Sequence, residues 1–136
     1  MIRGFEDILN KLNENDKKLA YLLMISFEKY PHGKAHKLTA GNIIAKFEAH
    51  GYKINDIKIR QLTHYLRVND LLIGLCSDSK GYWMSGSEEE LKNTYLSLCD
   101  RLREQLTTAH ALARHYKLLY NKDIKETQQN KGKSLI

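Results

Sequence analysis

Between Ser87 and Gly132 the sequence contains no proline and no glycine, so nothing in this stretch interrupts an α-helix. The stretch opens with a capping box, in which Ser87 is the N-cap and Glu90 is expected to reach back to the Ser87 backbone N–H. The acidic first turn also opposes the positive end of the helix dipole. We therefore predict one helix over residues 87–122, roughly nine turns at about 3.6 residues per turn.

Apolar residues recur along this helix at alternating spacings of four and three, which is the heptad pattern of a coiled coil. A single helix cannot bury such a seam by itself. It either folds back on the rest of the chain or pairs with the same helix of a second chain, and we predict a homodimer. Gln105, in the middle of the seam, is the kind of polar residue that can set the register between two paired helices. The predicted dimerisation residues are Leu91, Tyr95, Leu98, Leu102, Gln105, Ala109, Leu112, Tyr116 and Leu119.

The only proline of the chain, Pro31, marks the end of an earlier helix. Asn15 precedes an apolar run, so we predict an N-cap at Asn15 and a helix that continues to Tyr30. Upstream of this helix, a few apolar residues at helical spacing predict an N-terminal arm within residues 1–15. They are Phe5, Ile8, Leu9 and Leu12.

Two more short helices are predicted before the middle of the chain. After the extended pair Lys37-Leu38, Thr39 caps the second helix, which Gly51 ends. Asn55 or Asp56 caps the third helix. The apolar inward faces of these two helices are Ile43, Ile44 and Phe47, and Ile59, Leu62 and Leu66.

A change of pattern after the third helix predicts a β-hairpin. Two apolar runs, 71–76 and 82–84, flank a polar loop that contains glycine. Tyr82 and Trp83 alternate along the return strand, and we expect Trp83 to point into the core. The predicted fold class is mainly α with a small β-hairpin and a long C-terminal helix.

Positive charge is concentrated in the middle of the sequence. The formal net charge is +6, and residues 29–80 hold nine lysines and arginines against four acids. Such a local excess is expected where one face of a domain meets a polyanion, although lysine can also serve only to keep a surface soluble.

The order helix, short strand, helix, turn, helix, hairpin resembles the winged helix-turn-helix fold, in particular small phage-type winged-helix proteins. The residues that carry the resemblance are Ile59 to Arg67 and the later run Ser79-Lys80-Gly81-Tyr82-Trp83. The resemblance covers roughly residues 16–86 and implies that the protein binds double-stranded DNA. It divides the chain into a winged helix-turn-helix domain over 1–86, a dimerisation helix over 87–122 and a flexible polar tail over 123–136.

The third helix has the two faces that insertion into the major groove requires. At about 100° per residue, Ile59, Leu62, Thr63 and Leu66 lie on one side and the polar residues lie over the other. On that outer half Arg60 can read guanine and Gln61 can read adenine. The candidate DNA-binding residues are Lys53, Asn55, Lys58, Arg60, Gln61, His64, Arg67, Ser79 and Lys80.

Alternatives remain for several of these positions. Arg60 could pair with Glu48, and Arg67 could cap carbonyl groups at the end of the helix. Ile57 falls on the outer face, where it either packs against the second helix or contacts a thymine methyl group. Asp78, at the tip of the hairpin, disfavours phosphate contact.

Other classes of function find little support in the sequence. It has no P-loop, G-x-G-x-x-G, H-E-x-x-H or nucleophile elbow, so we expect neither an enzyme nor a cofactor. His110 and His115 lie about 140° apart on a helix, and Cys76 and Cys99 form no C-x-x-C, so we expect no metal site. The sequence has no secretory leader and no apolar run of about 18 residues, so we expect a cytoplasmic protein without a membrane partner.

These observations predict a sequence-specific, dimeric, DNA-binding regulator of transcription, of phage or mobile-element type. One alternative is a DNA-binding adaptor in replication or packaging. The other is a protein-interaction module that binds or inhibits a second, unidentified protein through the winged-helix surface.

Overall fold

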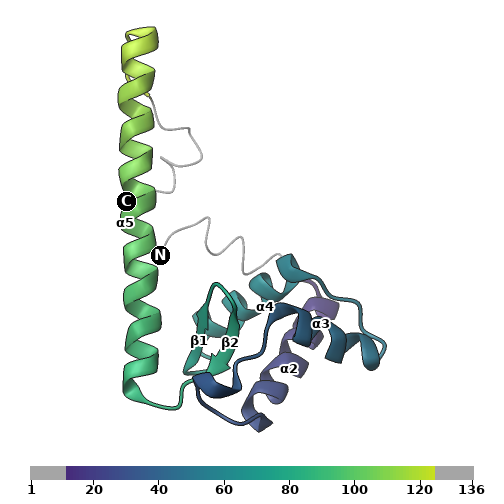
Figure 1. Ribbon diagram of the computed structural model, residues 1–136. Helices are drawn as coiled ribbons and strands as arrows, with labels where there is room; N and C mark the ends of the chain where they lie inside the picture. The colour runs from purple at the N-terminus through teal and green to yellow at the C-terminus, as the bar shows by residue number, and fades with distance from the viewer. Residues whose placement is uncertain (1–11, 125–136) are drawn as a thin grey trace. The chain divides into compact units, whose positions relative to one another are not determined.

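The structure, a computed structural model, describes residues 12–124 and is mainly helical, with one small antiparallel hairpin and a long C-terminal helix, as predicted (Figure 1). Most of the predicted N-terminal arm and polar tail lies outside the described residues. The chain divides into two units, of which one is Leu12–Tyr95 and the other takes in the chain from Leu96 onward. The elements are α2 (Glu14–Lys29), η1 (Lys34–His36), α3 (Ala40–Ala49), α4 (Asp56–Val68), β1 (Leu75–Asp78), β2 (Gly81–Met84) and α5 (Glu88–Tyr120).

Side-chain caps start the three short helices. Thr39 and Asn42 form a reciprocal capping box at α3, and the Asn55 side chain accepts a hydrogen bond from the Lys58 N–H at α4, so both predicted caps are confirmed. The predicted cap of α2 was wrong, because Asn13 accepts from the Asp16 N–H at 2.7 Å. The two asparagines are equally suitable caps, and the earlier start places Asp16 inside the helix, facing α4.

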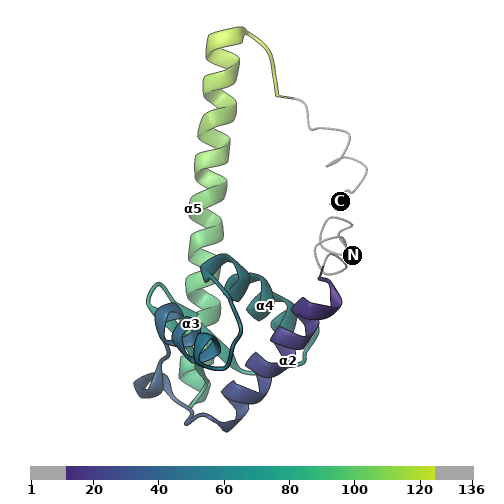
Figure 2. The same cartoon turned by 90° about the vertical axis from the view of Figure 1, so that its right-hand side faces the viewer.

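The core of the Leu12–Tyr95 unit lies between α2, α3, α4 and one face of the hairpin (Figure 1). Each helix contributes residues at helical spacing, and the hairpin contributes one residue from each strand. Figure 2 shows α2 and α4 next to each other. The principal buried residues are Leu19, Leu23 and Phe27 of α2, Ile43 and Phe47 of α3, Ile59, Leu62 and Leu66 of α4, and Leu75 and Met84 of the strands.

The hairpin begins later than predicted and has a tighter turn. β1 starts at Leu75, and Asp78 pairs with Gly81, so only Ser79 and Lys80 lie between the strands. Of the run 71–76, only Leu75 and Cys76 lie in β1, because the backbone N–H groups of Leu71 and Leu72 donate to the carbonyl of Leu66 and extend the end of α4. Apolar composition could not distinguish this connection from a strand.

The second strand has a partner on each edge. Besides β1, Tyr82 pairs with Leu38, with N–H to carbonyl distances of 2.8 and 2.9 Å in the two directions. This pairing confirms the extended segment predicted at Leu38. Trp83 is buried, at 4% exposure, but it lies on the face of the hairpin opposite Leu75 and Met84. Tyr82 is the aromatic residue of β2 that packs against the core.

The close approach of Leu38 to the turn requires glycine at position 81. A Cβ atom there would lie 2.4 Å from the Leu38 carbonyl oxygen. We expect Gly81→Ala to lower the free energy of unfolding by about 2 kcal/mol, measured by urea denaturation. Gly41→Ala is the matched control, because its Cβ meets only Thr39 Oγ1, at 3.8 Å, and should stabilise α3 by about 0.5 kcal/mol. Equal effects of the two substitutions would contradict the steric explanation.

Candidate nucleic-acid interface

Helix α4 has the two faces that the sequence predicts. Its buried side is Ile59, Leu62, Thr63 and Leu66, and Arg60 and Gln61 are exposed on the other side. Ile57 is 61% exposed, so most of its surface is open to solvent. The outer face therefore offers one guanidinium, one carboxamide and one aliphatic side chain, which are the groups that read guanine, adenine and the thymine methyl group in a major groove.

Two of the predicted DNA-binding cations hold the fold together instead of facing outward. Lys58 Nζ lies 3.0 Å from the carboxylate of Asp16, whose residue is only 7% exposed, and so joins α4 to α2. Arg67 donates through Nε and Nη2 to the carbonyl of Leu75 and through Nη2 to Ser77 Oγ, which fixes the hairpin to the end of α4. Burial lowers the pKa of Arg67.

The other candidates differ in how freely they face solvent. The side chains of Lys53, Arg60 and Lys80 are exposed and form no ion pair within residues 12–124, and the alternative pairing of Arg60 with Glu48 is not formed there. Gln61 and Ser79 are exposed as well. The Asn55 oxygen is used in capping α4, and His64 is half-buried and has an interaction partner.

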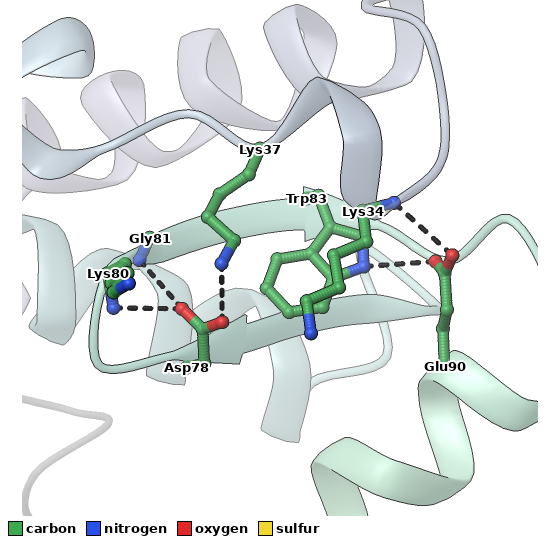
Figure 3. A network of polar contacts seen from close by, with 7 residues as sticks. All are labelled: Lys34, Lys37, Asp78, Lys80, Gly81, Trp83 and Glu90. Carbon is green, nitrogen blue, oxygen red and sulfur yellow. Dashed lines mark hydrogen bonds and ion pairs between the residues drawn. The ribbon is translucent and has the colours of Figure 1, made fainter.

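The carboxylate of Asp78, which was expected to disfavour a phosphate contact, organises the hairpin turn. Asp78 accepts hydrogen bonds from the backbone N–H groups of Lys80 and Gly81, and from Lys37 Nζ (Figure 3). Desolvation raises the pKa of Asp78, but these hydrogen bonds outweigh it and leave the pKa lowered. Lys37 balances the negative charge of Asp78. The ammonium group of Lys80 is therefore the charge that the turn presents to solvent.

A second carboxylate holds the opposite end of the hairpin. Glu90 accepts from the Trp83 indole N–H at 3.0 Å and from the Lys34 N–H at 3.3 Å (Figure 3). It also accepts from the Gly86 N–H at 2.9 Å. The predicted capping box is therefore half right: Ser87 Oγ accepts from the Glu90 N–H, but the Glu90 carboxylate bonds to Gly86 in place of Ser87. A buried indole N–H needs an acceptor, and Glu90 supplies it.

Two lysines lie over the ring of the same indole. Lys37 Nζ lies 5.0 Å and Lys34 Nζ 5.9 Å from the centroid of the Trp83 ring, within the range of cation–π attraction. Sequence reasoning missed the contact of Lys37 with Asp78 and that of Glu90 with the indole. The Asp-Ser-Lys-Gly run could have indicated the turn at Asp78, but no local pattern points from position 78 to position 37.

The Glu90 contacts predict a specific dependence of stability on pH. The Gly86 N–H lowers the pKa of Glu90 most, desolvation opposes it, and the Lys34 N–H and the indole lower it further. As the pH falls, the Glu90 carboxylate is therefore protonated in the unfolded chain before it is protonated in the folded one. The stability that Glu90 contributes is lost as the pH falls through the lowered pKa. We expect the difference in unfolding free energy between wild type and Glu90→Gln to be largest near pH 7 and to shrink below about pH 4.

The control for that measurement is Glu89→Gln, an exposed change in the same helical turn. Urea denaturation between pH 3 and pH 7 gives the unfolding free energy of each protein as a function of pH. The curve for Glu90→Gln should differ from those for wild type and Glu89→Gln. A constant difference at all pH values would contradict the role of the Glu90 charge.

Apart from Tyr116, the seam predicted along α5 consists of exposed side chains. Leu91, Tyr95, Leu98, Leu102, Leu112 and Leu119 are among the exposed large hydrophobic residues, and Gln105 and Ala109 are exposed as well. Tyr116 is half-buried, with its ring centroid 5.4 Å from that of Tyr120. An unbroken helix that carries so many exposed leucines has apolar surface available for a partner.

Comparison with known proteins identifies no relative: no protein-family model, no curated protein and no solved structure matches this chain. Within residues 12–124, no helix is long and apolar enough to cross a membrane. In the same part of the chain, no group of three or more histidine, cysteine, aspartate or glutamate side chains is placed to hold a metal ion.

Proposed function

We propose that this protein is a winged helix-turn-helix protein that binds double-stranded DNA as a homodimer and regulates transcription, in a phage or another mobile element. The observation that carries the proposal is the outer face of α4, where Ile57, Arg60 and Gln61 are exposed, opposite a buried side made of Ile59, Leu62, Thr63 and Leu66. A helix with this division of side chains suits insertion into the major groove.

The order of the elements supports the winged-helix assignment. Helix α2, the paired segment at Leu38, α3, α4 and the hairpin follow one another as helix, strand, helix, helix and two strands. The hairpin is fixed to α4 through Arg67, so the turn at Ser79 and Lys80 has a defined position relative to the outer face of α4. Lys80 then suits a contact with the DNA backbone beside the groove.

The α5 seam supports the dimer. Two copies that pair through it would present two α4 helices to the two halves of a pseudo-palindromic site. The choice of transcriptional regulation over other processes that use DNA binding rests on the resemblance to phage-type winged-helix proteins.

Fluorescence anisotropy with a labelled random duplex of about 30 base pairs tests the proposal. Affinity should fall steeply as salt rises, because each neutralised phosphate releases about 0.9 of a counterion. Selection from random duplexes should then enrich a two-fold symmetric sequence. Absence of binding at about 50 mM salt would rule out the proposed function.

A further inference from the structure

A pocket of about 500 Å³ opens between α2 and α3, in the Leu12–Tyr95 unit. Its volume is within the range of about 300–1,000 Å³ that is typical of small-molecule sites. It is lined by Leu22 and Ile25 of α2, by Ile43 and Phe47 of α3, and by the aromatic residues Tyr30 and Tyr52. The ring of Tyr52 meets Phe47 edge-on, with centroids 6.2 Å apart, and so lines the pocket with an aromatic surface.

Two basic side chains line this pocket. They are Lys46 and His50, and none of the lining residues is a carboxylate. Lys46 Nζ lies 5.7 Å from the centroid of the Tyr30 ring, so the lysine of α3 reaches toward the end of α2.

The histidine is oriented by its own helix. His50 Nδ1 lies 2.9 Å from the Lys46 carbonyl oxygen. Because a carbonyl can only accept, Nδ1 carries the hydrogen of this bond, and Nε2 of the neutral ring is an acceptor. The pocket thus combines apolar walls with two basic groups from one turn of α3.

We infer that this pocket binds a small carboxylic acid with an apolar body, such as a medium-chain alkanoate, with its carboxylate on Lys46. The chain of the ligand would replace water against the walls, and its charge complements the ammonium of Lys46. The surface that we propose for DNA involves other residues of α4 and the hairpin turn. Binding of the acid can therefore be measured without DNA, and its outcome is independent of the proposed function.

Octanoate is the probe, followed by amide chemical shifts of the full-length protein during titration. We expect the shifts to concentrate in α2, α3 and the segment to Tyr52, and to leave the hairpin unchanged. Octanoate should bind about ten-fold more tightly than octanol, which has the same chain without the charge, and octyltrimethylammonium should bind more weakly than either. Equal affinities for the three compounds, or no shifts at the lining residues with millimolar octanoate, would overturn the inference.

Lys46→Met tests the proposed carboxylate partner, because methionine keeps the apolar stem and removes the charge. The variant should bind octanoate only as well as octanol, and its affinity for octanol should be unchanged, which also shows that the pocket is intact. Lys29→Met removes an exposed lysine from α2 that does not line the pocket and serves as the control. Equal octanoate affinities of the two variants would refute the assignment of Lys46.

Discussion

Substituting Lys53, Arg60 and Lys80 together with alanine should weaken binding to a random DNA duplex by about 100-fold at about 0.1 M salt. The three side chains are exposed, and none forms an ion pair within the described part of the chain, so their loss should leave the fold unchanged. If each neutralises one phosphate, the slope of log affinity against log salt should become shallower by about two to three units. Anisotropy titrations at four salt concentrations measure both quantities.

The matched control removes the same amount of charge elsewhere. Lys17, Lys29 and Lys92 are exposed lysines outside α4 and the hairpin, and their combined replacement by alanine should change affinity by less than about three-fold and leave the slope nearly constant. If both triple variants lose the same affinity, net charge alone attracts the DNA and the proposed interface is wrong. Lys58 and Arg67 are unsuitable for this test, since their replacement would also loosen the packing of α4.

Much of the fold could be predicted because its signals are local. Thr39 and Asn55 indicate the starts of two helices, because their side chains accept hydrogen bonds from the backbone three residues later. The absence of glycine and proline after Ser87 leaves α5 uninterrupted. The start of β1 could not be predicted in the same way. Residues 71–74 are as apolar as a strand, but the backbone N–H groups of Leu71 and Leu72 donate to the Leu66 carbonyl at the end of α4, which apolar composition does not show.

The candidate site was predictable only in part, for a related reason. Helical periodicity separates the inner and outer faces of α4 correctly, since it depends only on spacing. It cannot show that Lys58 is paired with Asp16, or that Lys37 balances Asp78 from 41 residues away. From sequence all the cations in the middle of the chain look alike, whereas the structure divides them into cations that hold the fold together and cations that face solvent.

Replacing Leu98 and Leu102 with asparagine should convert the proposed dimer into a monomer. Each leucine that is buried on pairing contributes about 2 kcal/mol, and four are lost per dimer, so the dissociation constant should rise by at least about 1,000-fold. Sedimentation equilibrium at about 50 µM protein should give one chain mass for the variant and two for the wild type. Helical content should remain high, because both positions are exposed within the single chain and the substitutions affect mainly the contact with a partner.

The same helix supplies the control for that prediction. Leu96 and Leu118 are exposed, at 44% and 81%, but lie outside the heptad seam. Their replacement by asparagine should leave the dimer intact, although it removes the same number of leucines. A wild-type chain that sediments as a monomer, or two double variants that dissociate equally, would contradict pairing through the seam.

Dissociation of the dimer should also change DNA binding in a way that separates the seam from the interface. The Leu98/Leu102 variant keeps Arg60, Gln61 and Lys80, so it should bind an isolated half-site as well as wild type does. On the full two-fold symmetric site it should lose the advantage of linking two modules, which typically amounts to about 100-fold or more. The triple variant at Lys53, Arg60 and Lys80 should show the opposite result, a dimer that binds both kinds of site weakly. Opposite effects of this kind would assign α5 to assembly and α4 to DNA contact, and equal losses on both sites would refute that division.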